Sequence, residues 1–457
     1  MTSSGPVPRR KFPRVVGTLS MALLAVCLAA PAASFAATPP SAAAGDVFFS
    51  PSASVVQAES PAGMRSFLST GHPQYTMQSY VWGGSLVEAK GQTDTFAFEM
   101  QRNNESIDGI PLVPVVTSAA LFNRSSAPGF AIGGLVGVAD LSLSVSQTSV
   151  PWSVRAQQSV AGQAPQFHDA RIVKGMIGTK GAVYEFTSLV PNGAAGAPAN
   201  QFLELYVRAQ DTTGMMQWGY GPSGFFPQWI YPAQRAAITY DYGNSVGKYL
   251  AATRDPMTNQ GDYYYTMPLL KVQRFSVRLG GQVVGKGSGG WIWFDNVEQQ
   301  FDAAANKVIS NGVNWLEFSV QFPKTQQAMK IGYVEQASVG RLNYAMLHDA
   351  HSPKARNGSF TDSVNWDIDK VHIRPIRSSL WTSPVSGQSY YLRYRVTLGG
   401  ARASQRAHLY IAAKFTDQEV NAGGRHAYEG LFSVTGTLCG KKVSGQTWTE
   451  VQPTASL

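Results

Sequence analysis

Short segments in which apolar and polar residues alternate recur along most of this chain, separated by glycine, asparagine and proline. Successive side chains of an extended strand point to opposite faces, so this alternation is typical of strands with one buried face. Convincing amphipathic helices are scarce. The pattern predicts an all-β protein whose sheets form barrels or sandwiches, with few helices. The clearest predicted strands cover residues 80–86, 95–101, 182–186, 202–208, 271–279, 315–321, 390–398 and 408–414.

The chain has 457 residues, which is more than one β-barrel domain needs. A polar segment with proline and glycine, residues 254–261, stands just before the aromatic run 263–265 and is the best candidate for a domain boundary. We therefore expect an N-terminal β domain over residues 46–261 and a C-terminal β domain over residues 262–452.

Residues 1–36 have the features of an export signal. A basic stretch that includes Arg9 and Arg10 precedes the moderately apolar residues 15–30, and small residues precede a cleavage point near residue 36. The order Arg-Arg-Lys-Phe resembles a twin-arginine signal, and ordinary Sec export is the alternative. Residues 37–45, rich in alanine and proline, are expected to form a disordered linker. The expected localisation is therefore periplasmic or secreted.

Several partner classes are disfavoured by composition. Charged residues make up 14% of the chain, and no basic run is interleaved with aromatics, so we expect no nucleic-acid partner. After the signal, no apolar run reaches the roughly 18 residues that span a bilayer, so no integral membrane protein is expected. His348, Asp349 and His351 lack a second ligand cluster, so no metal is expected. Cys27 belongs to the signal and Cys439 stands alone, which predicts no internal disulfide.

The segment 279–301 carries the strongest chemical signal. Trp291, Trp293 and Asp295 occupy alternate positions, so a strand would present all three on one face. Burial among aromatic side chains raises the pKa of a carboxyl group, which is one way to make a general acid. The alternative is that both tryptophans are core residues and that Asp295 caps a turn.

Other aromatic groups are candidates for the walls of an apolar pocket. They lie at residues 218–221, 225–229 and 263–265, with glycine and proline between them. Aromatic side chains can line a concave ligand site and offer tyrosine hydroxyls or indole N–H groups as polar contacts. Ordinary core packing is the alternative for each group.

The chain also resembles a known family. The run YYYTMPLLKV is followed by G-x-x-W-x-W-F-D, by the block LWTSPVSG with YYLRYR, and by FTDQE and AYEG; SYVWGGSL stands near the start. This order is similar to that of the AttH-like, lipocalin-like family, which includes hydroxyneurosporene synthase (a carotenoid 1,2-hydratase) and kievitone hydratase. The resemblance implies two tandem calycin-type β domains with a ligand site between or within them. It also implies chemistry on lipophilic, often isoprenoid alkenes without an organic cofactor.

By this resemblance, Asp295 matches the proton donor of the hydratases. The family commonly reads W-x-D-x-x-W-G here, whereas this chain lacks the second tryptophan and the glycine. In the hydratase hypothesis, Asp295 protonates an alkene, Trp293 and Tyr264 stabilise the cation, and Glu298 or Glu429 orients the water. The expected ligand-binding residues are Trp82, Trp218, Tyr220, Tyr264, Trp291 and Trp293.

Two other functions share parts of this evidence. A non-catalytic carrier of a lipophilic metabolite would need the same pocket without a proton donor. A surface or adhesion protein would instead expose an aromatic patch. The enzyme and carrier hypotheses differ at Asp295, whose replacement by asparagine should stop turnover in an enzyme and spare ligand affinity in a carrier.

Overall fold

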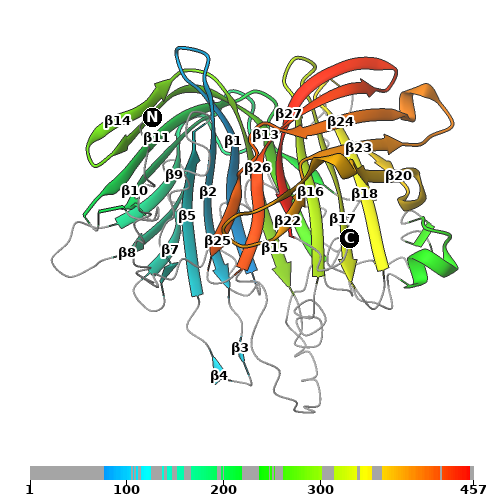
Figure 1. Ribbon diagram of the computed structural model, residues 1–457, viewed down its shortest axis with the longest axis horizontal. Coiled ribbons are helices and arrows are strands. Elements are labelled where there is room, and N and C mark those ends of the chain that lie inside the picture. The colour runs from blue at the N-terminus through cyan, green and yellow to red at the C-terminus, as the bar shows by residue number, and fades with distance from the viewer. Residues whose placement is uncertain are drawn as a thin grey trace, which may run out of the picture.

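The computed structural model describes residues 77–452 except for the internal segments that follow: 104–105, 108–109, 112–114, 125–135, 138–140, 147–151, 159–165, 193–196, 199, 219–235, 246–247, 250–251, 253–260, 301–312, 337–339, 352–362 and 423–424. The predicted export signal and linker therefore lie outside the described residues. Nearly all regular structure is β, as predicted, and forms two large curled sheets side by side (Figure 1).

The first sheet is antiparallel and contains 13 strands, which are those from β1 to β15 except β3 and β4. Its order is β6-β5-β2-β1-β15-β13-β11-β10-β9-β8-β7, and β12 and β14 pair with β13. The bounds are β1 Met77–Val87, β2 Thr93–Asn103, β5 Val115–Asn123, β6 Val136–Gly137, β7 Leu141–Ser146, β8 Ser153–Gln158, β9 Gln166–Lys174, β10 Val183–Pro191, β11 Phe202–Asp211, β12 Met216–Trp218, β13 Gly261–Leu279, β14 Gln282–Gly287 and β15 Trp291–Gln300.

The second sheet follows in the chain, with the order β19-β18-β17-β16-β27-β26-β24-β23-β20 and β25 paired to β26. Its bounds are β16 Val313–Phe322, β17 Gln327–Gln336, β18 Gly340–Asp349, β19 Ser363–Trp366, β20 Val371–Pro375, β23 Arg393–Leu398, β24 Ala407–Ala413, β25 Glu419–Ala422, β26 Arg425–Leu438 and β27 Lys441–Val451. Small pairs are β3 Ser106–Ile107 with β4 Ile110–Pro111, and β21 Leu380–Thr382 with β22 Ser389–Tyr391.

Helical structure is short in the described part of the chain. It includes a π-helical turn, η1 Ala237–Asp241, and the 3-10 turns η2 Ile368–Lys370, η3 Arg377–Ser379 and η4 Ala403–Gln405. Among the described residues, no helix has the length and apolar character that crossing a membrane requires.

The predicted domain boundary at residues 261/262 needs correction. β13 and β15 pair with β11 and β1, so they complete the first sheet instead of opening the second. The chain changes sheet between the end of β15 at residue 300 and the start of β16 at residue 313. The segment 254–261 misled the prediction because polar residues with proline and glycine mark connections between strands of one sheet as well as between domains.

Each sheet curls around a separate apolar core. In the first, Trp82 is fully buried and stacks on Phe294, with 4.8 Å between ring centroids. In the second, Phe318 packs edge-on against Tyr394 and Phe432. Alternate residues of the central strands face these cores, so the remaining residues of the same strands face the other sheet.

Direct contacts between these outward faces tie the sheets together. Gln446 of β27 accepts a hydrogen bond from Ser85 of β1 at 2.8 Å and donates to the carbonyl of Trp291 at 3.0 Å. Gly83 of β1 lies so close to Trp448 that a Cβ at this position would be 2.6 Å from the indole ring. The two sheets therefore pack against each other, which places their outward-facing polar residues in a buried interface.

Candidate functional site

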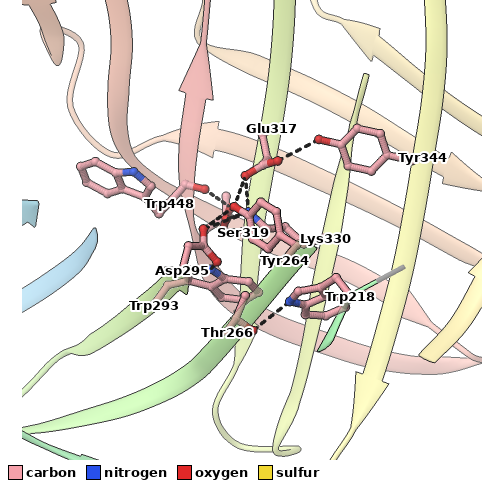
Figure 2. A network of polar contacts seen from close by, with 11 residues as sticks. Trp218, Tyr264, Thr266, Trp293, Asp295, Glu317, Ser319, Lys330, Tyr344 and Trp448 are labelled. Carbon is pink, nitrogen blue, oxygen red and sulfur yellow. Dashed lines mark hydrogen bonds and ion pairs between the residues drawn. The ribbon is translucent and has the colours of Figure 1, made fainter. Parts of the chain in front are cut away.

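A cluster of polar side chains lies in this interface (Figure 2). On β15, Ile292 and Phe294 face the core of the first sheet, so Trp293 and Asp295 face the second sheet. Tyr264 of β13 points the same way, because its hydroxyl contacts Asp295. The second sheet contributes side chains from β16 and β17. The strand alternation that predicted one face for Trp293 and Asp295 is thus confirmed.

Lys330 of β17 is the centre of the cluster and has no exposed surface. Its Nζ donates to the hydroxyl of Tyr264 at 2.5 Å, to Ser319 Oγ at 2.7 Å and to Asp295 Oδ2 at 3.1 Å. It also forms an ion pair with Glu317 Oε1. Burial alone would lower the pKa of Lys330, but the surrounding carboxylates outweigh it and raise the pKa above its ordinary value. Lys330 is therefore a permanent buried cation.

Asp295 is buried and accepts hydrogen bonds at both oxygens. The indole N–H of Trp293 donates to Oδ1, while the hydroxyl of Tyr264, at 2.5 Å, and Lys330 donate to Oδ2. Burial raises the pKa of Asp295 to about 6, against the lowering effect of Lys330. A carboxyl group whose pKa lies this near neutrality can both give and take a proton.

Tyr264 links the two carboxylates that contact Lys330. Its hydroxyl lies 2.5 Å from Asp295 Oδ2 and 3.0 Å from Glu317 Oε1. Glu317 also accepts a hydrogen bond from Tyr344 of β18 at 2.9 Å. The tyrosine reaches Glu317 across Gly332 of β17, where a Cβ would overlap the phenol ring. Tyr264 is thus placed to pass a proton between Glu317 and Asp295.

Three glutamates form a row across neighbouring strands of the second sheet. Glu450 of β27 pairs directly with Glu429 of β26 on one side and with Glu317 of β16 on the other. Residues directly opposed on antiparallel strands have Cβ atoms about 4.5–5.5 Å apart. Burial, followed by repulsion from Glu450, Glu99 and Glu317, raises the pKa of Glu429 well above its ordinary value.

Glu99 of β2 approaches this row from the first sheet. It lies in the same cross-strand row as Asp295, since both pair with Val81 of β1. Burial raises the pKa of Glu99 to about 8. Burial and the nearby Glu317 likewise raise the pKa of Glu450 to about 8. At neutral pH, protonated Glu99 and Glu450 therefore adjoin Lys330 and the acidic groups that contact it.

Aromatic side chains cover the first-sheet side of the cluster. Trp218 of β12 stacks on Trp293, with 5.8 Å between centroids and 17° between ring planes. Its indole N–H donates to Thr266 of β13 at 2.8 Å. Lys330 Nζ lies 4.3 Å from the ring centroid of Tyr264 and 5.3 Å from that of Trp293. The rings thus pack against the lysine as well as against each other.

The structure brings together several of the predicted site residues. Asp295, Trp293, Tyr264 and Trp218 are joined in the cluster, and Glu429 belongs to the adjoining glutamate row. Trp291 is half-buried in the same interface, where its carbonyl accepts from Gln446.

The remaining predicted residues lie elsewhere. The side chain of Trp82 is in the core of the first sheet, on the opposite face of that sheet from Asp295. Glu298 lies in β15 opposite Tyr263, and its side chain is outside the described part of the structure. Tyr220 is also outside the described residues. In the described part of the chain, no group of histidine, cysteine, aspartate or glutamate side chains is arranged to hold a metal ion.

Sequence reasoning missed most of the second-sheet contribution, namely Glu317, Ser319, Lys330, Tyr344 and Glu450. On β16 the polar residues Glu317 and Ser319 alternate with the core residues Leu316 and Phe318, which is also the pattern of a strand with one face in water. One signal could have found them. Only 14% of the residues in this chain are charged, so charged residues at the outward positions of predicted strands, such as Glu317 and Lys330, are unusual.

Comparisons with known proteins bear on the fold. The sequence matches no known family profile and none of the curated proteins. The crystal structure of a protein from Nitrosomonas europaea, assigned as AttH, superposes with a TM-score of 0.51 at 16% identity, covering 85% of this chain and 95% of that one. The chain has the fold of this AttH protein. The predicted AttH-like architecture of two tandem barrel-like domains is therefore confirmed.

Two further solved structures are similar at lower scores. Kievitone hydratase from Nectria haematococca has a TM-score of 0.45 at 12% identity, covering 84% of this chain and 92% of that one. CghA has a TM-score of 0.47 at 11% identity, covering 83% of this chain and 88% of that one. The fold assignment rests on the AttH protein, and the function depends on the site itself.

Proposed function

We propose that this protein is a hydratase- or lyase-like enzyme that protonates an alkene of a hydrophobic, isoprenoid-type small molecule, with Asp295 as the acid. The observation that carries the proposal is the buried Asp295, whose pKa is raised to about 6 and which shares hydrogen bonds with Tyr264 and Lys330. Titratable groups with strongly perturbed pKa values that touch one another are typical of acid–base catalysis. The departure from the family pattern after Asp295 leaves this arrangement in place.

The reaction would begin with transfer of the Asp295 proton to one alkene carbon. A C–H bond forms from the π electrons, and the other carbon becomes a cation. Asp295 is left as a carboxylate, which Lys330, Tyr264 and the indole of Trp293 stabilise by hydrogen bonds that already exist. Because no donor must move, the cost of creating the charge is low.

Water would then complete the addition. Its oxygen bonds to the cationic carbon, and the proton it loses passes to the carboxylate of Asp295 or Glu317, so that alkene and water yield an alcohol. Since the rings of Trp293 and Tyr264 already pack against Lys330, we assign stabilisation of the cation mainly to Asp295 and Glu317. Elimination of water is the same sequence in reverse.

The carrier hypothesis is less well supported. A lipocalin-type carrier holds its ligand inside a barrel. Here the described interior of each curled sheet is filled by buried apolar side chains, among them Trp82, Phe98 and Phe186 in the first and Phe318, Tyr394 and Phe432 in the second. The titratable groups lie between the sheets instead, where a carrier has no need of them. Export of the mature chain remains part of the proposal and rests on residues 1–36.

The test is to incubate the protein with a panel of isoprenoid alkenes in water labelled with oxygen-18 and deuterium. Wild type should produce an alcohol that carries the heavy oxygen together with a deuterium on carbon. Asp295→Asn should lose this product, because an amide cannot supply the proton. Asp369→Asn is the matched control, since Asp369 is exposed and pairs with Lys370 far from the cluster. Equal product from wild type and Asp295→Asn would contradict the proposal.

A further inference from the structure

Positive charge is concentrated where β20, β23 and β24 lie together at one end of the second sheet (Figure 1). Residues 371–416 contain seven arginine and lysine residues and no aspartate or glutamate. In these strands the residues that face the core alternate with residues that face outward. The arginines at outward positions, Arg374, Arg393 and Arg395, are exposed, and so is Arg377 of η3. The outer face of this end of the sheet is therefore cationic.

Two of these arginines lie directly opposite each other. Arg374 of β20 pairs in register with Arg395 of β23. Like charges in this position destabilise a sheet. In the part of the chain that the structure describes, neither guanidinium forms an ion pair with a carboxylate, whereas Arg171 and Arg208 of the first sheet both pair with Glu185. The opposed pair thus adds repulsion to the fold without an ion pair to offset it.

The β21–β22 hairpin adjoins the arginines and exposes apolar side chains. It starts directly after η3, which contains Arg377, and its second strand leads into β23 at Arg393. Leu380 is 52% exposed and Val385 is 73% exposed. Apolar side chains this exposed lie between two cationic residues of the chain.

A buried carboxylate fixes the conformation of this hairpin. Glu419 of β25 accepts hydrogen bonds from the hydroxyl of Ser383 at 2.5 Å and from that of Tyr390 at 2.8 Å. The hydroxyl of Ser386 donates to the same carboxylate. Trp381 stacks on Tyr390, with 6.1 Å between ring centroids. The exposed apolar side chains are therefore held on a rigid frame, which gives the LWTSPVSG block a structural role outside the cluster around Asp295.

We propose that this surface binds the anionic phospholipid headgroups of a membrane. It is named the arginine–hairpin surface and consists of Arg374, Arg377, Arg393, Arg395, Leu380 and Val385. Guanidinium groups donate in a planar fork that matches phosphate, so two opposed arginines suit one headgroup or two neighbouring ones. Cationic side chains are attracted to an anionic leaflet, and exposed apolar side chains enter the boundary between headgroups and acyl chains.

The apolar part of the surface favours a bilayer over a soluble polyanion. Nucleic acid would satisfy the arginines but would leave Leu380 and Val385 in water. The inference goes beyond the proposed function and does not depend on the reaction at Asp295. A bilayer is nevertheless where a hydrophobic substrate of the proposed kind would be dissolved.

Co-sedimentation with lipid vesicles tests the proposal. The protein used is residues 37–457, which keep every described strand and omit the basic, apolar export signal, since the signal would itself attract lipid. It should bind vesicles of phosphatidylglycerol and phosphatidylcholine and bind pure phosphatidylcholine much more weakly. Raising the salt concentration from about 50 mM to about 500 mM should release it, because salt screens the attraction. Failure to bind the anionic vesicles at low salt would overturn the proposal.

The double variant Arg374→Gln, Arg395→Gln should weaken binding to the anionic vesicles roughly 30-fold. Its thermal unfolding midpoint should equal or exceed that of wild type, since the change removes repulsion. The matched control is Lys174→Gln, Lys271→Gln, which removes two exposed cations from the first sheet and should change binding little. An equal loss in the control would show that overall charge alone governs binding, and the surface would be wrongly assigned.

The double variant Leu380→Ser, Val385→Ser distinguishes a bilayer from a soluble polyanion. It keeps every arginine and shortens two exposed side chains, so its folding should match that of wild type. It should bind anionic vesicles roughly tenfold more weakly, because it loses the apolar contact. If it binds the vesicles as wild type does, while the arginine variant loses binding to a short DNA duplex, the partner is a polyanion and the proposal fails. Turnover has no part in these assays, so their outcome is independent of the proposed function.

Discussion

Lys330 of the second sheet lies 3.1 Å from Asp295 of the first, and both side chains are buried. Neither sheet contains the pair by itself. A buried ion pair is weak evidence of stability, because desolvation offsets most of the attraction between the charges. Its presence between two otherwise well-packed sheets supports the proposed acid–base chemistry, which needs a fixed cation beside a titratable carboxyl group.

Replacing Lys330 by methionine should be strongly destabilising at alkaline pH. It leaves the carboxylates of Asp295 and Glu317 buried without a counter-charge, which costs about 3–5 kcal/mol. Without the lysine, the pKa of Asp295 should rise further above 6, so at pH 5 the group is protonated and the loss shrinks. Urea unfolding of wild type and Lys330→Met at pH 5 and pH 8 measures the loss of unfolding free energy at each pH. Lys370→Met, in an exposed pair with Asp369, should change neither; equal losses for Lys330→Met at both pH values would refute the argument.

Glu99→Gln should stabilise the protein above pH 8. The pKa of Glu99 is raised by burial from 4.5 to about 8, so the folded state holds a proton that the unfolded state has released. Stability from this group is therefore complete below pH 4.5 and is lost as the pH rises to 8. Glutamine cannot ionise, so thermal unfolding at pH 9 should show a gain on the order of a few kcal/mol over wild type, and little difference at pH 5. A gain that is independent of pH would argue against a protonated Glu99.

Tyr264→Phe should slow turnover by roughly 10²-fold, within the range for a lost proton-transfer group. The change removes the hydroxyl that joins Asp295 to Glu317 and leaves the ring. Tyr344→Phe is the matched variant, because its hydroxyl donates to the other oxygen of Glu317. It should slow turnover much less. Initial rates in the labelled-water assay compare the two, and equal effects would remove Tyr264 from the transfer path.

Gly83→Ala should weaken the contact between the sheets. The added Cβ would lie 2.6 Å from the ring of Trp448, so the sheets must separate or the indole must move, at a cost of about 1–3 kcal/mol. Gly399→Ala is the control, since its Cβ would meet only ordinary van der Waals contacts. Trp448→Phe, which is smaller, should recover part of the loss when combined with Gly83→Ala. Chemical denaturation of wild type, the two single variants at positions 83 and 448 and the double variant measures the coupling between the two residues. If the losses in unfolding free energy are strictly additive, the strain does not lie between Gly83→Ala and Trp448.

Strand positions were the most predictable part of this structure. The alternation in residues 315–321 predicted β16 because apolar side chains that face a core repeat at every second position. The same period predicted that Trp293 and Asp295 share a face. This prediction depends on the sequence of one strand alone and does not require its partner strands to be known.

The composition of the interface could not be predicted in the same way. The polar face of β16 looks identical whether water or another sheet covers it, so Glu317 gave no sign of its ion pair with Lys330. The change of sheet after residue 300 was missed for a related reason, since pairing of β15 with β1 joins segments about 200 residues apart and leaves no local trace.

Among the described strands, those of the first sheet end with β15 at residue 300, and those of the second sheet begin with β16 at residue 313. Asp295 and Tyr264 precede that point, whereas Lys330 and Glu450 follow it. Interrupting the polypeptide there would yield two fragments, each holding half of the reactive groups. Under the proposed function, turnover by a mixture of the fragments would report their reassociation, as in a split-enzyme sensor.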